Sequence, residues 1–114
     1  MNLDELAEAI RNVSSERVVQ ELATLLIEWK SNDKTAEELG NTIERYFGHA
    51  WIERNEDHKN LYNMWSAFKN EVISGIEGMT MNERLYWFGL FQRFDACLNQ
   101  EGKLVIYRKL HANP

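Results

Sequence analysis

Apolar residues recur with a helical period along almost the whole chain. Residues 3–10 and 18–29 each carry a stripe of apolar side chains spaced three, four or seven positions apart, with charged residues outside the stripe. An α-helix brings residues three and four positions apart onto one face, so each stripe predicts an amphipathic helix with its apolar face toward a core. The polar residues 31–34 predict a turn after the second helix.

Three positions carry the residues that begin helices. Asn2, Thr35 and Thr80 are each followed three positions later by a glutamate. In a capping box the first side chain accepts a hydrogen bond from the backbone of the fourth residue, and the glutamate side chain accepts one in return. Helices are therefore predicted to begin after Asn2, Thr35 and Thr80.

The middle of the chain predicts two further helices. The helix after Thr35 is expected to stop or bend between residues 51 and 55. The next is expected over residues 56–74, because apolar side chains repeat at helical spacing there and Gly75 and Gly78 follow. Short loops are expected between all of these helices.

Residues 80–99 predict the most apolar helix of the chain. Its main stripe consists of Trp87, Phe91, Phe94 and Leu98. A helix that is apolar over more than half its circumference is normally surrounded by others. This segment is therefore expected to be the central element, with Leu85 and Phe88 off its main stripe. An ion pair between Arg84 and Asp95 on this helix would be structural.

Residues 103–110 fit either a strand or a helix. Residues 104–107 have strand propensity, but a lone strand in a helical chain has no partner for its backbone groups. A short C-terminal helix after a break at Gly102 is the prediction, and a strand is the alternative.

These patterns predict an all-α protein in which residues 1–114 form a single domain. Five or six helices are expected to pack as one compact bundle with irregular or orthogonal packing. The chain has 114 residues, of which 44% are hydrophobic and 27% charged. This length supports one core but not two, and the composition is too apolar for a disordered segment.

Negative charge is concentrated in the first half of the chain. The formal net charge is −5, with 13 of the 18 acidic residues but only 6 of the 13 basic residues in residues 1–57. Residues 1–57 therefore carry −7 and residues 58–114 carry +2. This balance disfavours nucleic acid as a partner and favours a basic protein.

The chain carries no pattern typical of export or membrane insertion. Its first residues are acidic where a signal peptide has basic ones, and no apolar run reaches about 18 residues. Cys97 is the single cysteine, so no disulfide framework is expected within the chain. A cytoplasmic protein without membrane contact is predicted.

Short catalytic and cofactor motifs do not occur in the sequence. His49 and Glu53 are spaced four positions apart on the predicted third helix, but no second pair completes a metal site. Cys97 lies on the apolar side of its helix, where a packed thiol is expected. The sequence therefore predicts no enzyme activity, no cofactor and no metal.

Two regions carry candidate binding residues. The C-terminal Lys103, Arg108, Lys109 and His111, together with Tyr107, could touch an anionic partner but are too few for duplex binding. The four Trp, four Tyr and five Phe residues outnumber the obvious core positions. Either the surplus rings widen the core or they form a protein-binding surface, since Trp and Tyr supply large contact areas. The predicted partner-binding residues are Glu44, Tyr46, His49, Trp51, Glu53, Glu56 and Asp57.

The function predicted from these features is that of a small cytoplasmic protein-binding protein. Its concrete form is an immunity or antitoxin protein that occludes a basic toxin, typically a nuclease, through an acidic surface bearing aromatic rings. One alternative is a ligand-binding or enzymatic bundle, with a pocket lined by Trp65, Trp87 and Phe91 and polar contacts from His49 or Asp95. Another is a homodimeric structural or regulatory domain that hides its surplus aromatic rings.

Overall fold

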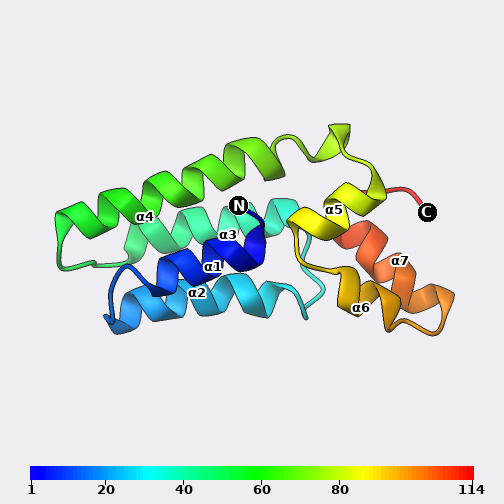
Figure 1. Ribbon diagram of the computed structural model, residues 1–114, viewed down its shortest axis with the longest axis horizontal. Coiled ribbons are helices and arrows are strands. Elements are labelled where there is room, and N and C mark those ends of the chain that lie inside the picture. The colour runs from blue at the N-terminus through cyan, green and yellow to red at the C-terminus, as the bar shows by residue number, and fades with distance from the viewer.

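The computed structural model describes residues 1 to 114 and contains helices without strands (Figure 1). The α-helices are α1 (Leu3–Arg11), α2 (Arg17–Trp29), α3 (Ala36–His49), α4 (Asn55–Phe68), α5 (Met81–Trp87), α6 (Phe91–Asp95) and α7 (Gln100–Lys109). A π-helix, η1 (Lys69–Ile73), continues α4, and a 3-10 helix, η2 (Ile76–Gly78), precedes α5. The all-α prediction is confirmed.

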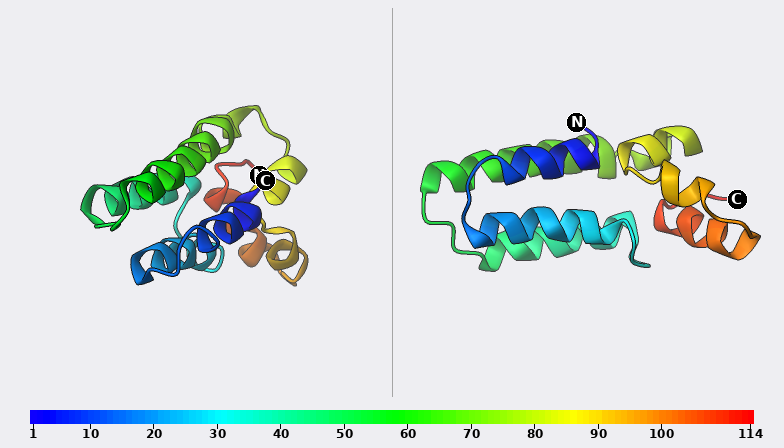
Figure 2. Two further views of the ribbon diagram at one scale, coloured as in Figure 1. Left: turned by 60° about the vertical axis from the view of Figure 1, so that its left-hand side comes forward. Right: turned by 60° about the horizontal axis from the view of Figure 1, so that its bottom comes forward.

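The helices form two groups along a molecule that measures 46 × 25 × 21 Å. Helices α1 to α4 run along the longest direction, and α1 packs against both α2 and α4, while α3 packs against α2 and η1 (Figure 1). Helices α5, α6 and α7 are shorter and gather at one end (Figure 2). We call these groups the four-helix part and the C-terminal part.

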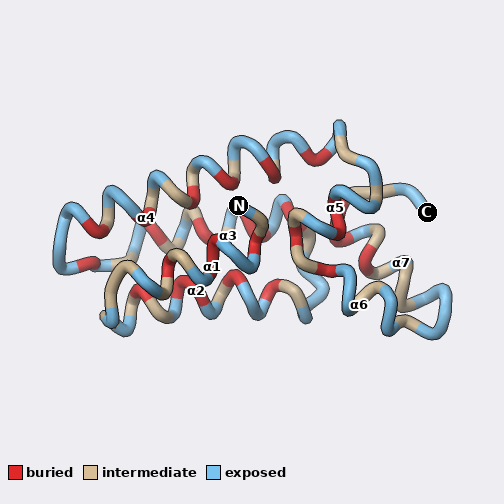
Figure 3. The backbone as a smooth tube through the Cα atoms, in the orientation of Figure 1, coloured by how far each residue is buried: buried red, intermediate tan, exposed pale blue.

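The apolar faces of the helices meet in one core of 24 buried hydrophobic residues. Buried positions repeat along the helices of both parts (Figure 3). The ring of Phe88, which follows α5, lies 5.5 Å from the ring of Trp29 on α2 and 5.9 Å from that of Phe68 on α4, measured between centroids. The core is therefore continuous between the four-helix part and the C-terminal part.

All three predicted capping boxes are present, at Asn2, Thr35 and Thr80. In each box the two reciprocal hydrogen bonds measure between 2.9 and 3.2 Å. The backbone N–H of Thr35 donates to Glu38, and that of Thr80 donates to Glu83. These hydrogen bonds hold the pKa of both carboxyl groups below the ordinary value. These local bonds fix where α1, α3 and α5 begin.

The prediction of one central helix over residues 80–99 is wrong. Helix α5 ends at Trp87, and Gly89 adopts a left-handed backbone with φ of +68°. The backbone N–H of Leu90 donates to the carbonyl of Leu85 at 2.9 Å, and that of Gly89 donates to Tyr86 at 3.2 Å. This pair of bonds is the Schellman arrangement that ends helices at a glycine. It explains why seven α-helices form where five or six were predicted.

The break also reverses which side chains are buried. Leu85, Phe88 and Leu90 lie in the core, whereas Leu98, assigned to the main stripe, is 98% exposed. Helix α6 contributes no buried residue. The predicted stripe from Trp87 to Leu98 requires one continuous helix. The turn at Gly89 interrupts that helix, so the residues after it face other directions than the helical spacing predicts.

Two further boundaries differ in detail from the prediction. The helix predicted over residues 56–74 consists of two segments. Its first part is α4, and from Lys69 its backbone hydrogen bonds change to the π-helical pattern of η1. Residues 103–110 are helical as predicted, but α7 begins at Gln100 because Asn99 caps it, accepting a hydrogen bond from the Gly102 backbone at 2.8 Å. Gly102 therefore lies in the first turn of α7 and does not precede the helix.

Arg84 and Asp95 do not form the ion pair considered for this segment. Arg84 is buried, and its guanidinium donates to the backbone carbonyls of Ile76 at 3.0 Å and His111 at 3.0 Å. Asp95 is exposed at the end of α6. Arg84 instead joins the segment before α5 to the end of the chain.

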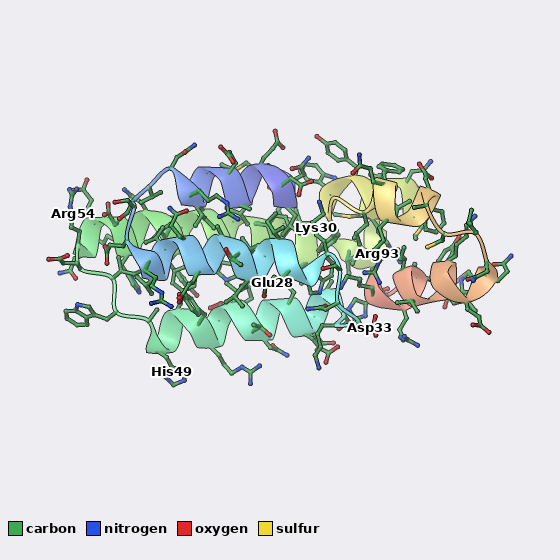
Figure 4. All side chains as sticks on the ribbon, turned by 90° about the horizontal axis from the view of Figure 1, so that it is seen from below. Glu28, Lys30, Asp33, His49, Arg54 and Arg93 are labelled. Carbon is green, nitrogen blue, oxygen red and sulfur yellow. The ribbon has the colours of Figure 1, made fainter.

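The loop between α2 and α3, residues 30–34, is held by basic side chains from the C-terminal part, and we call it the junction loop. Lys109 on α7 is fully buried, and its Nζ donates to the Asn32 carbonyl at 2.9 Å, the Asn32 Oδ1 at 3.1 Å and the Lys34 carbonyl at 2.9 Å. Arg93 on α6 donates to the Lys30 carbonyl at 2.7 Å (Figure 4). Lys109 is therefore unavailable to the anionic partner considered for the basic C-terminus.

Candidate interaction surface

The seven predicted partner-binding residues lie on α3, the loop between α3 and α4, and the first turn of α4. His49 and Arg54, at the two ends of this loop, mark the end of the molecule opposite the C-terminal part (Figure 4). The structure divides the seven residues into three that hold helices together or are buried and four that are exposed.

Glu44 belongs to a polar cluster between α3 and the end of α4. Its carboxylate accepts hydrogen bonds from Lys69 Nζ at 2.7 Å and from the Tyr62 hydroxyl at 3.0 Å. The hydrogen bond from Lys69, assisted by that from Tyr62, lowers the pKa of Glu44, and the shared carboxylate raises the pKa of Tyr62 and Lys69. The carboxylate is satisfied within the chain, so its position is explained by helix packing.

Tyr46 and Asp57 are also turned into the protein. The Tyr46 hydroxyl donates to the Val18 carbonyl on α2 at 2.6 Å, and burial raises its pKa. Asp57 lies in the first turn of α4 and is 8% exposed. An acidic residue in this turn interacts favourably with the helix dipole. Tyr46 is one of the rings that widen the core.

The remaining four residues face solvent, and we call them the end surface: His49, Trp51, Glu53 and Glu56. Trp51 is 83% exposed, which is unusual for so large a ring. The next residue, Ile52, is 5% exposed and packs into the core. A buried anchor beside an exposed ring fixes the loop that presents Trp51.

Backbone hydrogen bonds hold this loop at both sides of Trp51. The Ala50 N–H donates to the Tyr46 carbonyl at 2.8 Å, and the Glu53 N–H donates to a Glu16 carboxylate oxygen at 3.3 Å. Glu56 pairs with Arg54 at 3.4 Å. Glu16, at the N-cap of α2, and Glu56, on α4, therefore place acidic groups at the end surface. Arg54 pairs with Glu56, and Lys59 lines the same hollow as Glu56.

His49 and Glu53 do not share one helix face, contrary to the prediction. Helix α3 ends at His49, so Glu53 lies in the loop beyond it. No group of three or more His, Cys, Asp or Glu side chains in the chain is arranged to hold a metal ion.

The residues proposed for a ligand pocket are not brought together. Trp65 is fully buried and packs on Phe68, whereas Trp87 packs on Tyr86 in the C-terminal part. His49 ends α3, at the end of the molecule opposite the C-terminal part, whereas Asp95 ends α6 within that part (Figure 4). Cys97 is half-buried, as expected for a packed thiol, and its Sγ–H donates to the Arg93 carbonyl at 3.2 Å.

One feature of the surface was not predicted. An apolar groove of about 340 Å³ runs between α1 and the second half of α4. The residues that line it are Met1, Leu6, Asn63, Met64, Ala67, Phe68 and Glu71. Leu6 and Phe68 fall on the apolar stripes of residues 3–10 and 56–74, which is the only sign of the groove that the pattern carries.

Comparison with known proteins places no relative beside this chain. No protein-family model, curated protein or solved structure matches it. Within the structure, none of the helices combines the length and the apolar character that crossing a bilayer requires.

Proposed function

We propose that this chain is a cytoplasmic protein-binding protein that holds a basic protein partner against the end surface, in the manner of an immunity or antitoxin protein that occludes a toxin. The observation that carries the proposal is Trp51, which is 83% exposed on a loop held in place by the buried Ile52. The end surface thereby presents one large ring for contact.

Burial of Trp51 against a partner supplies the main gain in free energy. A tryptophan buries up to about 250 Å² in an interface, and at about 25 cal/mol per Å² this is worth several kcal/mol. Tryptophans are enriched among the residues that dominate interface energetics. Because hydrogen bonds already fix the loop, little conformational entropy is lost on binding.

Charge supports a basic partner. Glu53 and Glu56 follow Trp51 in the chain, Glu16 contacts the Glu53 backbone, and the whole chain carries −5. Such a surface attracts a basic partner and accelerates its association at low salt. A nuclease presents basic groups to the phosphates of its substrate, and a carboxylate-bearing surface can occupy the same groups.

The test begins with recovery of a partner from the native cells on the immobilised protein and its identification by mass spectrometry. The affinity of the purified partner is then measured by calorimetry for the native chain, Trp51→Ala and the matched variant Tyr86→Ala. Tyr86 is 49% exposed in the C-terminal part. We expect Trp51→Ala to lower the affinity for the partner at least tenfold and Tyr86→Ala to leave it unchanged. The affinity of the native chain should decrease as the salt concentration rises. Equal affinity for Trp51→Ala and the native chain would overturn the proposal.

A further inference from the structure

The groove between α1 and α4 has an apolar interior. Leu6 and Phe68 are 1% and 4% exposed and form its deepest part, while Met64 is half-buried. Met1, 58% exposed, and Ala67 complete the apolar lining. The groove thus offers apolar surface beside methionine side chains, which adapt to differently shaped partners.

The charged side chains that line this groove and the hollow beside it are all acidic, and the α-ammonium group of Met1 is the one positive charge on the lining. Glu71 lines the groove directly. Asp4, Glu5 and Glu8 line the adjoining hollow on the exposed face of α1, which shares Met1 with the groove, and Asp4 is paired with Lys30 at 2.8 Å. Neither hollow is lined by a lysine or arginine. The lysine nearest in sequence to Glu71, Lys69, is bound to Glu44 on α3.

Two of these carboxylates have no partner inside the chain. Glu5 accepts a hydrogen bond in the capping box of α1, but Glu8 and Glu71 make no side-chain hydrogen bond or ion pair. Glu71 on the groove, and Glu8 on the adjoining hollow, are therefore free to pair with cationic side chains of a partner.

From this arrangement we propose that the groove binds a basic amphipathic helix of a protein partner. The groove follows α4 from residue 63 to residue 71, which corresponds to about 12 Å or two helical turns. Its walls are helices whose backbone groups are bonded internally, so an extended strand finds no backbone edge to pair with. Apolar side chains at positions i, i+4 and i+7 of a partner helix enter the groove, and a lysine or arginine of that helix reaches Glu71.

This site is independent of the end surface. The end surface lies at the N-terminus of α4, and the groove lies beside its C-terminal half. Trp51 lines neither the groove nor the adjoining hollow. Binding at the end surface and binding in the groove can therefore be tested separately.

The test uses two synthetic helical peptides with the same leucine face, one with lysine and one with glutamate at the remaining positions. Binding is followed by fluorescence anisotropy, and the site by amide chemical-shift changes in the labelled protein. We expect the leucine–lysine peptide to bind at least tenfold more tightly than the leucine–glutamate peptide, with shifts centred on Leu6, Ala67 and Glu71.

Variants of the protein locate the site. Ala67 is exposed on α4, so Ala67→Arg adds bulk and positive charge without disturbing the core and is expected to abolish binding. Glu71→Lys should weaken binding at least fivefold. Glu28→Lys, an equal charge reversal on the exposed face of α2, and Trp51→Ala should leave it unchanged (Figure 4).

Three results would overturn the inference. They are equal affinity for both peptides, unchanged binding to Ala67→Arg, and equal losses for Glu71→Lys and Glu28→Lys. The Trp51→Ala variant is tested with the peptide as well as with the native partner. If this variant loses the partner but keeps the peptide, the result bears on the end surface alone and not on the groove.

Discussion

The ammonium nitrogen of Lys109 lies 3.8 Å from the centre of the Trp29 ring. The residue is fully buried, and its remaining contacts are the Asn32 and Lys34 oxygens of the junction loop. A buried cation is tolerated when its protons are bonded and an aromatic face adds attraction. Lys109 therefore joins α7 to the connection between α2 and α3.

Replacement of Lys109 by methionine keeps the length of the side chain but removes its donors. Acceptors in the junction loop are left without partners, so we expect Lys109→Met to lower the free energy of unfolding by about 2 kcal/mol at pH 6. Urea unfolding followed by circular dichroism measures this. Lys103→Met is the control, because Lys103 only overlies Phe94 at 5.2 Å, and it should cost well under half as much. Equal losses would contradict the structural role.

Lys109 also predicts a dependence of stability on pH. Burial, with the nearby Arg93 charge, lowers its pKa to about 7 from an ordinary 10.5. Between these values the unfolded chain binds more protons than the folded one, so the contribution of Lys109 to stability increases as pH rises. We expect the native chain to gain about 1 kcal/mol per pH unit relative to Lys109→Met between pH 7 and 9. Parallel pH profiles for the two proteins would show that the group does not titrate in this range.

Gly89 requires the absence of a side chain. Its φ of +68° strains any L side chain, and a Cβ there would lie 2.6 Å from an Asp4 carboxylate oxygen. We expect Gly89→Ala to cost about 1–2 kcal/mol, measured by thermal or urea unfolding. Gly48→Ala, in α3 with nothing within 4 Å of the added Cβ, should instead stabilise by up to about 1 kcal/mol. The prediction fails if the two substitutions change stability in the same direction.

Glu44 and Lys69 are expected to be energetically coupled. Their ion pair of 2.7 Å is about one-third exposed on both sides. A double-mutant cycle with Glu44→Gln and Lys69→Met should give a coupling of about 1 kcal/mol at neutral pH. Because the folded pKa of Glu44 is lowered, this contribution is present above the usual carboxyl range and is lost as pH falls through the lowered value. Strictly additive effects at pH 7 would contradict the coupling.

Trp51 is expected to matter little for stability. At 83% exposure, Trp51→Ala should change the free energy of unfolding by less than about 0.5 kcal/mol. Trp65→Ala, at a fully buried position, should cost about 3–5 kcal/mol. A large loss for Trp51→Ala in chemical denaturation would mean that the ring supports the fold and not a partner.

Local signals in the sequence predict the starts of the helices well. The capping boxes at Asn2, Thr35 and Thr80 depend only on residues three positions apart, and all three form. The stop at Gly89 was missed because apolar side chains continue at helical spacing on both sides of it. A glycine between two aromatic segments was the available sign of a helix end.

The candidate surface was predicted less well than the helices. Trp51 is exposed as the prediction of a binding surface requires, but the position of Glu44 depends on Tyr62 in α4 and Lys69 in η1. The sequence predicts Lys109 to be a surface charge, because the oxygens that accept its hydrogen bonds belong to residues 75 and 77 positions earlier in the chain. Contacts between residues so far apart leave no periodic pattern in the sequence, so they cannot be predicted from the spacing of apolar and polar residues.

The distance in sequence between Lys109 and the junction loop bears on the order of folding during synthesis. Helices α1 to α4 leave the ribosome first, and their apolar faces can meet before α7 exists. The carbonyls of Asn32 and Lys34 receive their buried donor only when the last helix has emerged. The connection between α2 and α3 is therefore made well before α7 supplies the residue that fixes it.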